Sequence, residues 1–141
     1  MNRNKFVMLA VIIMSALVLS ACGGGGGDTS EEVTVPAPYS GMTNPFDGDS
    51  AAAAAGEGIY ATKCVSCHGE TGKGDGPAGQ ALTPPAGDLT KVVNTIGDDY
   101  LFYRISEGGA MEPFNSSMPA QKSVLSEDEI WQVITHIKSF K

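Results

Sequence analysis

The chain has 141 residues, with 9 lysines and arginines against 16 aspartates and glutamates, so its formal net charge is −7 at pH 7. An acidic surface repels phosphates, so this charge argues against nucleic-acid binding and against docking through a lysine-rich patch. It favours a partner with a basic or neutral face, although an acidic surface that only keeps the domain soluble is an equally good reading. The length allows one small domain with a modest core.

Residues 1–21 are expected to be a lipoprotein signal peptide. Arg3 and Lys5 precede an apolar stretch from Phe6 to Leu19, the pattern of an export signal. The stretch ends in Leu19-Ser20-Ala21-Cys22, which resembles the bacterial lipobox. Cys22 is therefore the expected lipidation site and would anchor the chain to the outer face of the cell membrane. An uncleaved membrane anchor is the alternative, although about 14 apolar residues are short for spanning a bilayer.

Residues 22–50 are expected to form the lipidated cysteine and a flexible tether. An unbroken glycine run, 23–27, is followed by a stretch with three prolines and no helix or strand period. Fully extended, the 28 residues after the cysteine would reach roughly 90–100 Å. Three large apolar side chains are unusual in a spacer and leave open that this segment is ordered along a neighbouring subunit: Tyr39, Met42 and Phe46.

Residues 51–141 are expected to form one domain of three or four short helices and long loops. Asp49 or Ser50 can cap a first helix that runs through the alanines 51–55. Ile59 and Tyr60 lie one turn further along the same side of this helix.

The strongest motif follows this helix directly, as Cys64-Val65-Ser66-Cys67-His68. Two thiols three positions apart, with a histidine after the second, form the attachment motif of a covalently bound c-type haem. On a helical turn the two sulfurs reach the vinyl groups on one porphyrin edge, and the next side chain presents an imidazole to the iron. Cys64 and Cys67 are therefore the expected attachment sites of one haem c, and His68 is the expected iron ligand.

Two other kinds of site also use a Cys-x-x-Cys pair, namely dithiol redox centres and zinc sites. A thioredoxin-type pair should lie between a strand and a helix, but the alanine-rich residues upstream look helical. A zinc site needs two further ligands at short spacing, whereas the other cysteine and histidine are Cys22 and the distant His136. Both remain as weaker alternatives.

The segment after the motif is expected to be an irregular loop at the haem edge. Five glycines lie between Gly69 and Gly79, but neither a preceding strand nor a following Gly-Lys-Ser/Thr supports a nucleotide-binding loop. Leu82-Thr83-Pro84-Pro85 must run extended.

Two more helices are expected in the second half of the domain. One begins at Asp98 and ends before Gly108-Gly109. The other begins at Ser126-Glu127-Asp128-Glu129, which has the pattern of a capping box. Apolar residues then follow a helical period at Ile130, Val133, Ile134 and Ile137. Because no stretch shows strand-like alternation, the fold is predicted to be all-α.

A methionine is the expected second ligand, because a thioether favours reduced iron and raises the haem potential. Outside the signal segment the methionines are Met42, Met111 and Met118. Met118 lies 50 residues after His68, enough chain to wrap around the ring, and Pro119 stiffens the backbone beyond it. Met118 is therefore the expected ligand and Met111 the alternative, while a packing role for Met118 stays open.

Residues 51–141 resemble a class I c-type cytochrome, through the pentapeptide at 64–68, Met118-Pro119 and the capped C-terminal helix. The family fold implies that the first and last helices cross. Gly56 and Tyr60 would meet Val133 and His136 there. His136 is a departure, since the family usually has an aromatic residue at that position.

The resemblance also implies a proline carbonyl, from Pro84 or Pro85, that accepts a hydrogen bond from the imidazole of His68. Candidates for contacts to the propionates or the haem edge are Tyr103, Arg104 and Trp131. For Trp131 a core position, and for Arg104 a solvated charge, are equally good readings.

Ligation on both sides would leave no open position for oxygen or peroxide, so one-electron transfer is expected rather than catalysis. The partners would be membrane-bound redox complexes: a quinol-oxidising donor, and a terminal oxidase or photosynthetic reaction centre as acceptor. A tethered shuttle is preferred over a fixed subunit of a larger respiratory assembly, although the small monohaem lipoprotein subunit of alternative complex III is similar. A haem sensor or peroxidase-like enzyme with a displaceable Met118 is the alternative from another class.

Overall fold

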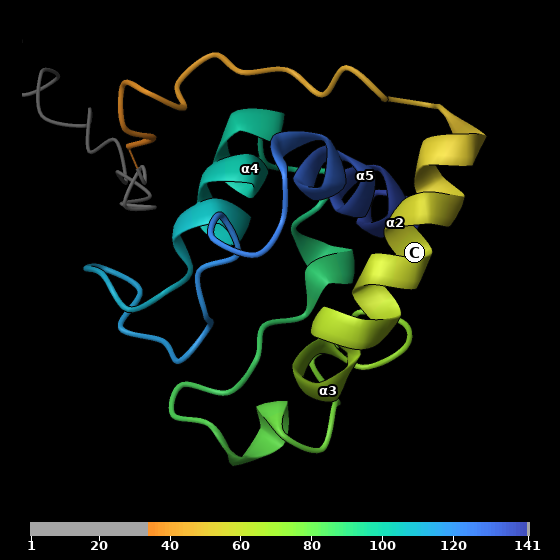
Figure 1. Cartoon of the computed structure of the whole chain (residues 1–141). Helices are drawn as coiled ribbons and strands as arrows, with labels where there is room; N and C mark the ends of the chain where they lie inside the picture. The colour runs from red at the N-terminus through yellow and green to blue at the C-terminus, as the bar shows by residue number, and fades with distance from the viewer. Residues whose placement is uncertain (1–33, 141) are drawn as a thin grey trace, which may run out of the picture. The chain divides into compact units, whose positions relative to one another are not determined.

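The computed structural model describes residues 34–140. The expected signal peptide, Cys22 and the first part of the expected tether lie outside these residues. The described helices are α2 (Ser50–Lys63), α3 (Val65–His68), α4 (Asp98–Glu107) and α5 (Glu127–Ile137), with short 3-10 turns η1 (Gly79–Ala81) and η2 (Leu89–Lys91). No strand occurs between residues 34 and 140 (Figure 1), which confirms the prediction of an all-α fold. Within the same range, none of the helices has the length and apolar character needed to cross a membrane.

The helix ends follow the capping signals of the sequence. Asp49 caps α2, since its carboxylate accepts the N–H groups of Ala51 and Ala52 at 2.8 and 3.2 Å. α5 begins with the predicted capping box, in which the Ser126 hydroxyl accepts from the Glu129 N–H and the Glu129 carboxylate accepts from the Ser126 N–H. These bonds satisfy backbone donors that have no partner within the helix.

α2 and α5 cross in close contact, as the resemblance implied. A Cβ atom added to Gly56 would lie 2.0 Å from the carbonyl oxygen of Gln132 and 2.9 Å from the amide nitrogen of Val133, so only glycine allows this approach. One turn further along α2, the ring of Tyr60 lies 5.2 Å from that of His136. Phe140 also packs on both rings, with centroids 5.3 Å from Tyr60 and 5.1 Å from His136, which keeps the crossing aromatic.

The hydrophobic core lies between α4 and α5 and reaches α2. The indole of Trp131 packs on the ring of Phe102 with centroids 4.4 Å apart, and both side chains are buried. Trp131 is therefore a core residue. The buried side chains that form the core are Tyr60, Val93, Leu101, Phe102, Ile105, Ile130, Trp131, Val133, Ile134 and Ile137.

Residues 34–49, which we call the N-terminal arm, pack on the helices. A flexible tether was expected for this segment. The compact unit begins at Thr34 rather than at residue 51. Asn44 is buried, and its amide group donates to the hydroxyl of Thr135 at 2.9 Å while its N–H donates to Asp98 at 3.0 Å. The arm crosses α4 and α5 before it enters α2 (orange in Figure 1), and its three large apolar side chains, Tyr39, Met42 and Phe46, pack against the core.

Candidate functional site

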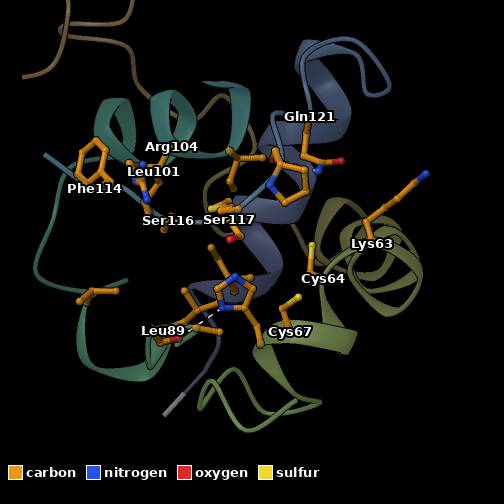
Figure 2. A pocket seen from close by; sticks show the side chains of 18 of the residues that line it. Lys63, Cys64, Cys67, Leu89, Leu101, Arg104, Phe114, Ser116, Ser117 and Gln121 are labelled. Carbon is orange, nitrogen blue, oxygen red and sulfur yellow. Dashed lines mark hydrogen bonds between the residues drawn. The ribbon is translucent and has the colours of Figure 1, made fainter. Parts of the chain in front are cut away.

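A cavity of about 450 Å³ opens between the α2–α3 corner and α4 (Figure 2). This volume falls in the range of about 300–1,000 Å³ that is typical of cofactor and small-molecule sites. Most of its wall is apolar. Four of the residues singled out in the sequence meet in this wall: Cys64, Cys67, His68 and Met118.

The pentapeptide forms a helical turn that directs its functional side chains into the cavity. The N–H of Cys64 donates to the carbonyl of Tyr60 at 2.9 Å, and the N–H of His68 donates to the carbonyl of Cys64 at 2.9 Å. The sulfur atoms of Cys64 and Cys67 both point into the same space, whereas the side chain of Lys63 points away (Figure 2). The geometry therefore suits two thioether bonds to one edge of a flat group.

The environment of the thiols does not suit dithiol redox chemistry. Burial, and to a lesser extent the neighbouring Cys67, raise the pKa of Cys64 to about 11, whereas a reactive thiol needs a lowered pKa. A zinc site also lacks support, because the described residues contain no cluster of three or more histidine, cysteine or carboxylate side chains that could hold a metal ion.

His68 is oriented by the carbonyl of Gly87, not by that of a proline. Its Nδ1 lies 3.4 Å from the Gly87 oxygen, while Pro84 and Pro85 contribute to the cavity wall. The N–H of Ala86 donates to the carbonyl of Gly79 at 3.1 Å, which ties the prolines' loop to η1 and leaves the next carbonyl facing the imidazole. Burial lowers the pKa of His68, and a neutral imidazole is the form that binds a metal.

Met118 enters the cavity from a loop that is bonded to the end of α4. We call residues 109–125 the Met118 loop. The carbonyl of Met118 accepts the N–H of Gly109 at 2.9 Å, and the N–H of Gln121 donates to the carbonyl of Ile105 at 3.0 Å. Gly108 has a φ of +75°, and a Cβ there would lie 2.5 Å from the Met118 oxygen. These contacts fix the position of Met118 along the cavity.

Met111, the alternative ligand, is not among the residues that line the cavity. Its sulfur lies 3.9 Å from a guanidinium nitrogen of Arg104 instead. Of the two methionines in the Met118 loop, the structure therefore brings only Met118 together with His68.

Arg104 lines the cavity opposite the cysteines (Figure 2). This position suits a contact to a bound group better than a fully solvated charge. Its guanidinium donates to the carbonyl of Gly108 at 2.6 Å and lies 3.5 Å from the ring centre of Phe114. Burial lowers the pKa of Arg104, but an arginine keeps its charge in proteins. It is a cation placed at the wall of an apolar cavity.

Tyr103 and Trp131 are not among the residues that line the cavity. The structure therefore does not bring Tyr103 to the site, and Trp131 takes the alternative position in the core. The ring of Tyr103 packs on Tyr39 of the arm, 5.3 Å away. On α4 the cavity face is formed by residues three and four apart, whereas Tyr103 lies on another face of the helix. The cavity face consists of Tyr100, Leu101, Arg104 and Ile105.

Sequence reasoning missed several residues of the cavity wall. Tyr100 shares a helix face with Arg104, so the four-residue spacing was a usable signal. Phe114, Ser116 and Ser117 come from the irregular Met118 loop, where no period indicates which side chains turn inward.

The comparisons with known proteins agree with this geometry. Residues 51–137 match the family described as "Cytochrome C oxidase, cbb3-type, subunit III". The chain is 31% identical over 96 residues to the cbb3-type cytochrome c oxidase subunit CcoP of Rhodobacter capsulatus, covering 64% of this chain. It spans only 30% of the length of that relative.

Among solved structures, the fold is similar to that of cytochrome cL from the methylotrophic bacterium Methylophaga aminisulfidivorans. The TM-score is 0.55 at 22% identity, over 82% of this chain and 71% of the other. This match supports the fold alone. The family match over residues 51–137 shows that the chain belongs to the cbb3-type subunit III family of cytochrome c domains. Together with the fold, it identifies the chain as a class I c-type cytochrome, an electron-transfer protein with haem c.

Proposed function

We propose that the chain is a one-electron carrier with a single covalent haem c, attached through Cys64 and Cys67 and ligated by His68 and Met118. The observation that carries this proposal is that all four side chains line one apolar cavity of suitable size. The resident haem would supply an iron that takes up and releases one electron.

The residues of the cavity have separable roles in this proposal. His68 and Met118 would both bind the iron, which would leave no site for oxygen or peroxide. The apolar wall excludes water and favours the less charged, reduced state, as the thioether ligand also does. Arg104 would balance a propionate carboxylate from within the wall.

Carbon monoxide binding to the reduced protein at neutral pH tests this function against its rival. A carrier with two protein ligands should bind carbon monoxide weakly and slowly. Ready binding would show an open or easily displaced position, and would favour a haem sensor or a peroxidase-like enzyme.

We further propose that Cys22 anchors the chain to the outer face of the cell membrane and that its partners are membrane-bound redox complexes. The Rhodobacter relative is a subunit of an oxidase by name, which supports an oxidase as the acceptor. A quinol-oxidising complex is the proposed donor. The packing of the arm shortens the possible reach, because only the 11 residues 23–33 lie between Cys22 and Thr34, and this span is at most roughly 40 Å when fully extended.

This short reach favours a partner that stays close to the protein. It therefore supports a second candidate function, that of a fixed subunit of a larger respiratory complex. Extraction of the membrane with a mild detergent separates the two. A fixed subunit should copurify with stoichiometric partners, whereas a short-range shuttle should be recovered alone after the same extraction.

A further inference from the structure

Glu107, the last residue of α4, joins three segments that are far apart in the sequence. Its carboxylate accepts a hydrogen bond from the hydroxyl of Tyr39, which belongs to the N-terminal arm. The same carboxylate binds the ammonium group of Lys122 in the Met118 loop, with Nζ 2.8 Å from Oε1 and 2.7 Å from Oε2. The arm, α4 and the Met118 loop therefore meet at one side chain.

Helix stability alone does not explain an acidic residue at the C-terminal end of α4. Carbonyl groups at a helix C-terminus carry partial negative charge, so a carboxylate there is unfavourable unless it is compensated. Lys122 first, and then Tyr39, compensate it and hold the pKa of Glu107 below its usual value. The same bond raises the pKa of Tyr39 to about 12, so at neutral pH the phenol stays a donor.

The Lys122 side of this link lies next to the contacts that position Met118. The N–H of Lys122 donates to the carbonyl of Ser106 at 3.2 Å, directly after the bond from Gln121 to Ile105. Lys122 is thus held to the last turn of α4 by its backbone and by its side chain, four residues beyond Met118. Without the side-chain bond, the backbone bonds of Gln121 and Lys122 alone would hold this end of the loop to α4.

The Tyr39 side is equally well defined. A turn in the arm, with the N–H of Tyr39 donating to the carbonyl of Pro36 at 2.8 Å, presents the ring to α4. The ring packs between Tyr103 and Phe102, with centroids at 5.3 and 6.1 Å. Packing from two aromatic neighbours fixes where the hydroxyl lies, so its bond to Glu107 is preorganised.

We infer that Tyr39, Glu107 and Lys122 act as positioning residues through which the N-terminal arm holds the Met118 loop against the end of α4. The arm thereby keeps Met118 in the place from which its sulfur reaches the iron. Detaching the arm loosens the Met118 side of the site and leaves the His68 side unchanged. This inference rests on the proposed ligation by Met118.

The test is displacement of the sixth ligand by imidazole in the oxidised, full-length holoprotein. Tyr39→Phe keeps the ring and removes only the hydroxyl, and Lys122→Met removes only the charge. Each should bind imidazole about threefold to tenfold more tightly than the wild type, as expected for the loss of one typical hydrogen bond. Glu107→Gln, which keeps the shape of the side chain, should give a similar change.

Lys138→Met is the matched control. Lys138 also pairs with carboxylates of the arm and of α4, at 2.8 Å from Asp47 and 2.9 Å from Asp98, but at the opposite end of α4. Its replacement should leave imidazole affinity unchanged. If Lys138→Met and Lys122→Met tighten imidazole binding equally, or if neither Tyr39→Phe nor Lys122→Met changes it, the inference is overturned.

Amide hydrogen exchange gives a second readout. In Tyr39→Phe the amide of Gln121 should exchange faster, while amides in the middle of α2 and α5 keep their wild-type rates; equal acceleration everywhere would mean a general loss of stability and would overturn the inference. The proposed function fails in a different way. If Met118→Ala leaves imidazole affinity as in the wild type, Met118 is not the ligand and the inference falls with it.

Discussion

The two sides of the cavity are built in different ways. On the His68 side, five consecutive residues place two thiols and an imidazole, and one helical turn with a nearby carbonyl orients them. On the Met118 side, a single methionine depends on backbone bonds from an irregular loop to α4, and that loop is tied in turn to the arm. The first side is fixed by local geometry, to which the proposed thioether bonds would add, and the second by contacts between distant segments. When the fold is perturbed, Met118 should therefore lose its position in the cavity before His68 does.

The largest effect on stability is expected at the crossing of α2 and α5, because α2 leads directly into the pentapeptide that contains His68. In Gly56→Ala the new methyl group would lie 2.0 Å from the Gln132 oxygen, so the helices must separate. We expect the free energy of unfolding of the holoprotein to fall by about 3 kcal/mol, near the upper end for overpacking, as measured by denaturant titration.

Gly58→Ala is the matched control, because it lies in the same helix with nothing within 4 Å of the added Cβ. It should raise the free energy of unfolding by about 0.5–1 kcal/mol, since alanine is the better helix former. Equal losses in the two variants would contradict the role of close helix packing.

The next two substitutions each add a methyl group, one on the Met118 side of the cavity and one on the His68 side. In Gly108→Ala, a Cβ would lie 2.5 Å from the Met118 oxygen at a φ of +75°; in Gly79→Ala, it would lie 2.1 Å from the Cys67 oxygen. Each should destabilise the fold by about 1–3 kcal/mol. Only Gly108→Ala should also release its ligand, with imidazole affinity rising on the order of tenfold.

The proposed thioether bonds at Cys64 and Cys67 would keep His68 on the iron in Gly79→Ala. Resonance Raman spectra of the reduced proteins can follow the two ligands separately. Loss of the histidine ligand in Gly79→Ala, with the methionine retained in Gly108→Ala, would reverse the comparison.

The smallest effect concerns His136, which stands at the helix crossing in the place of an aromatic residue. Burial lowers the pKa of His136 from its ordinary value, against a smaller opposing effect of Glu57. The unfolded chain therefore binds a proton more readily, and the stability that the neutral ring contributes is lost as the pH falls below about 6.5 through the folded-state pKa. His136→Phe should remove this part of the pH dependence.

Melting temperatures of wild type and His136→Phe at about pH 7.5 and pH 5 measure the difference, over the window that unperturbed histidine titration defines. The wild type should lose more stability on acidification than the variant. The effect is small, because the ring is only half-buried and solvent screens its charge. Parallel pH profiles would show that His136 does not report on the crossing.

The same contrast between local and distant contacts explains what could be predicted from the sequence. The end of α4 at Gly108 and the start of α5 follow from caps within a few residues, and the pentapeptide carries its own geometry. The carbonyl that faces His68 could not be placed, because the choice between Pro84, Pro85 and Gly87 depends on how the loop folds back on η1.

The packing of the arm could not be predicted for a related reason. Its sequence has prolines and no period, and its buried polar side chain, Asn44, bonds to Thr135, 91 positions away. Tyr39, Met42 and Phe46 were the available signal, but their partners on the helices have no local mark in the sequence. The position of Tyr103 could not be predicted, because α4 has two aromatic faces and no rule distinguishes them in the sequence. One face contacts the arm and the other lines the cavity.

The absorption spectrum of the oxidised holoprotein tests the proposed site most directly, through the weak far-red band that a methionine sulfur gives when it binds ferric haem. The band should be present in the wild type and in Met111→Ala, and absent in Met118→Ala. A band that survives in Met118→Ala, or that disappears in Met111→Ala, would contradict ligation by His68 and Met118.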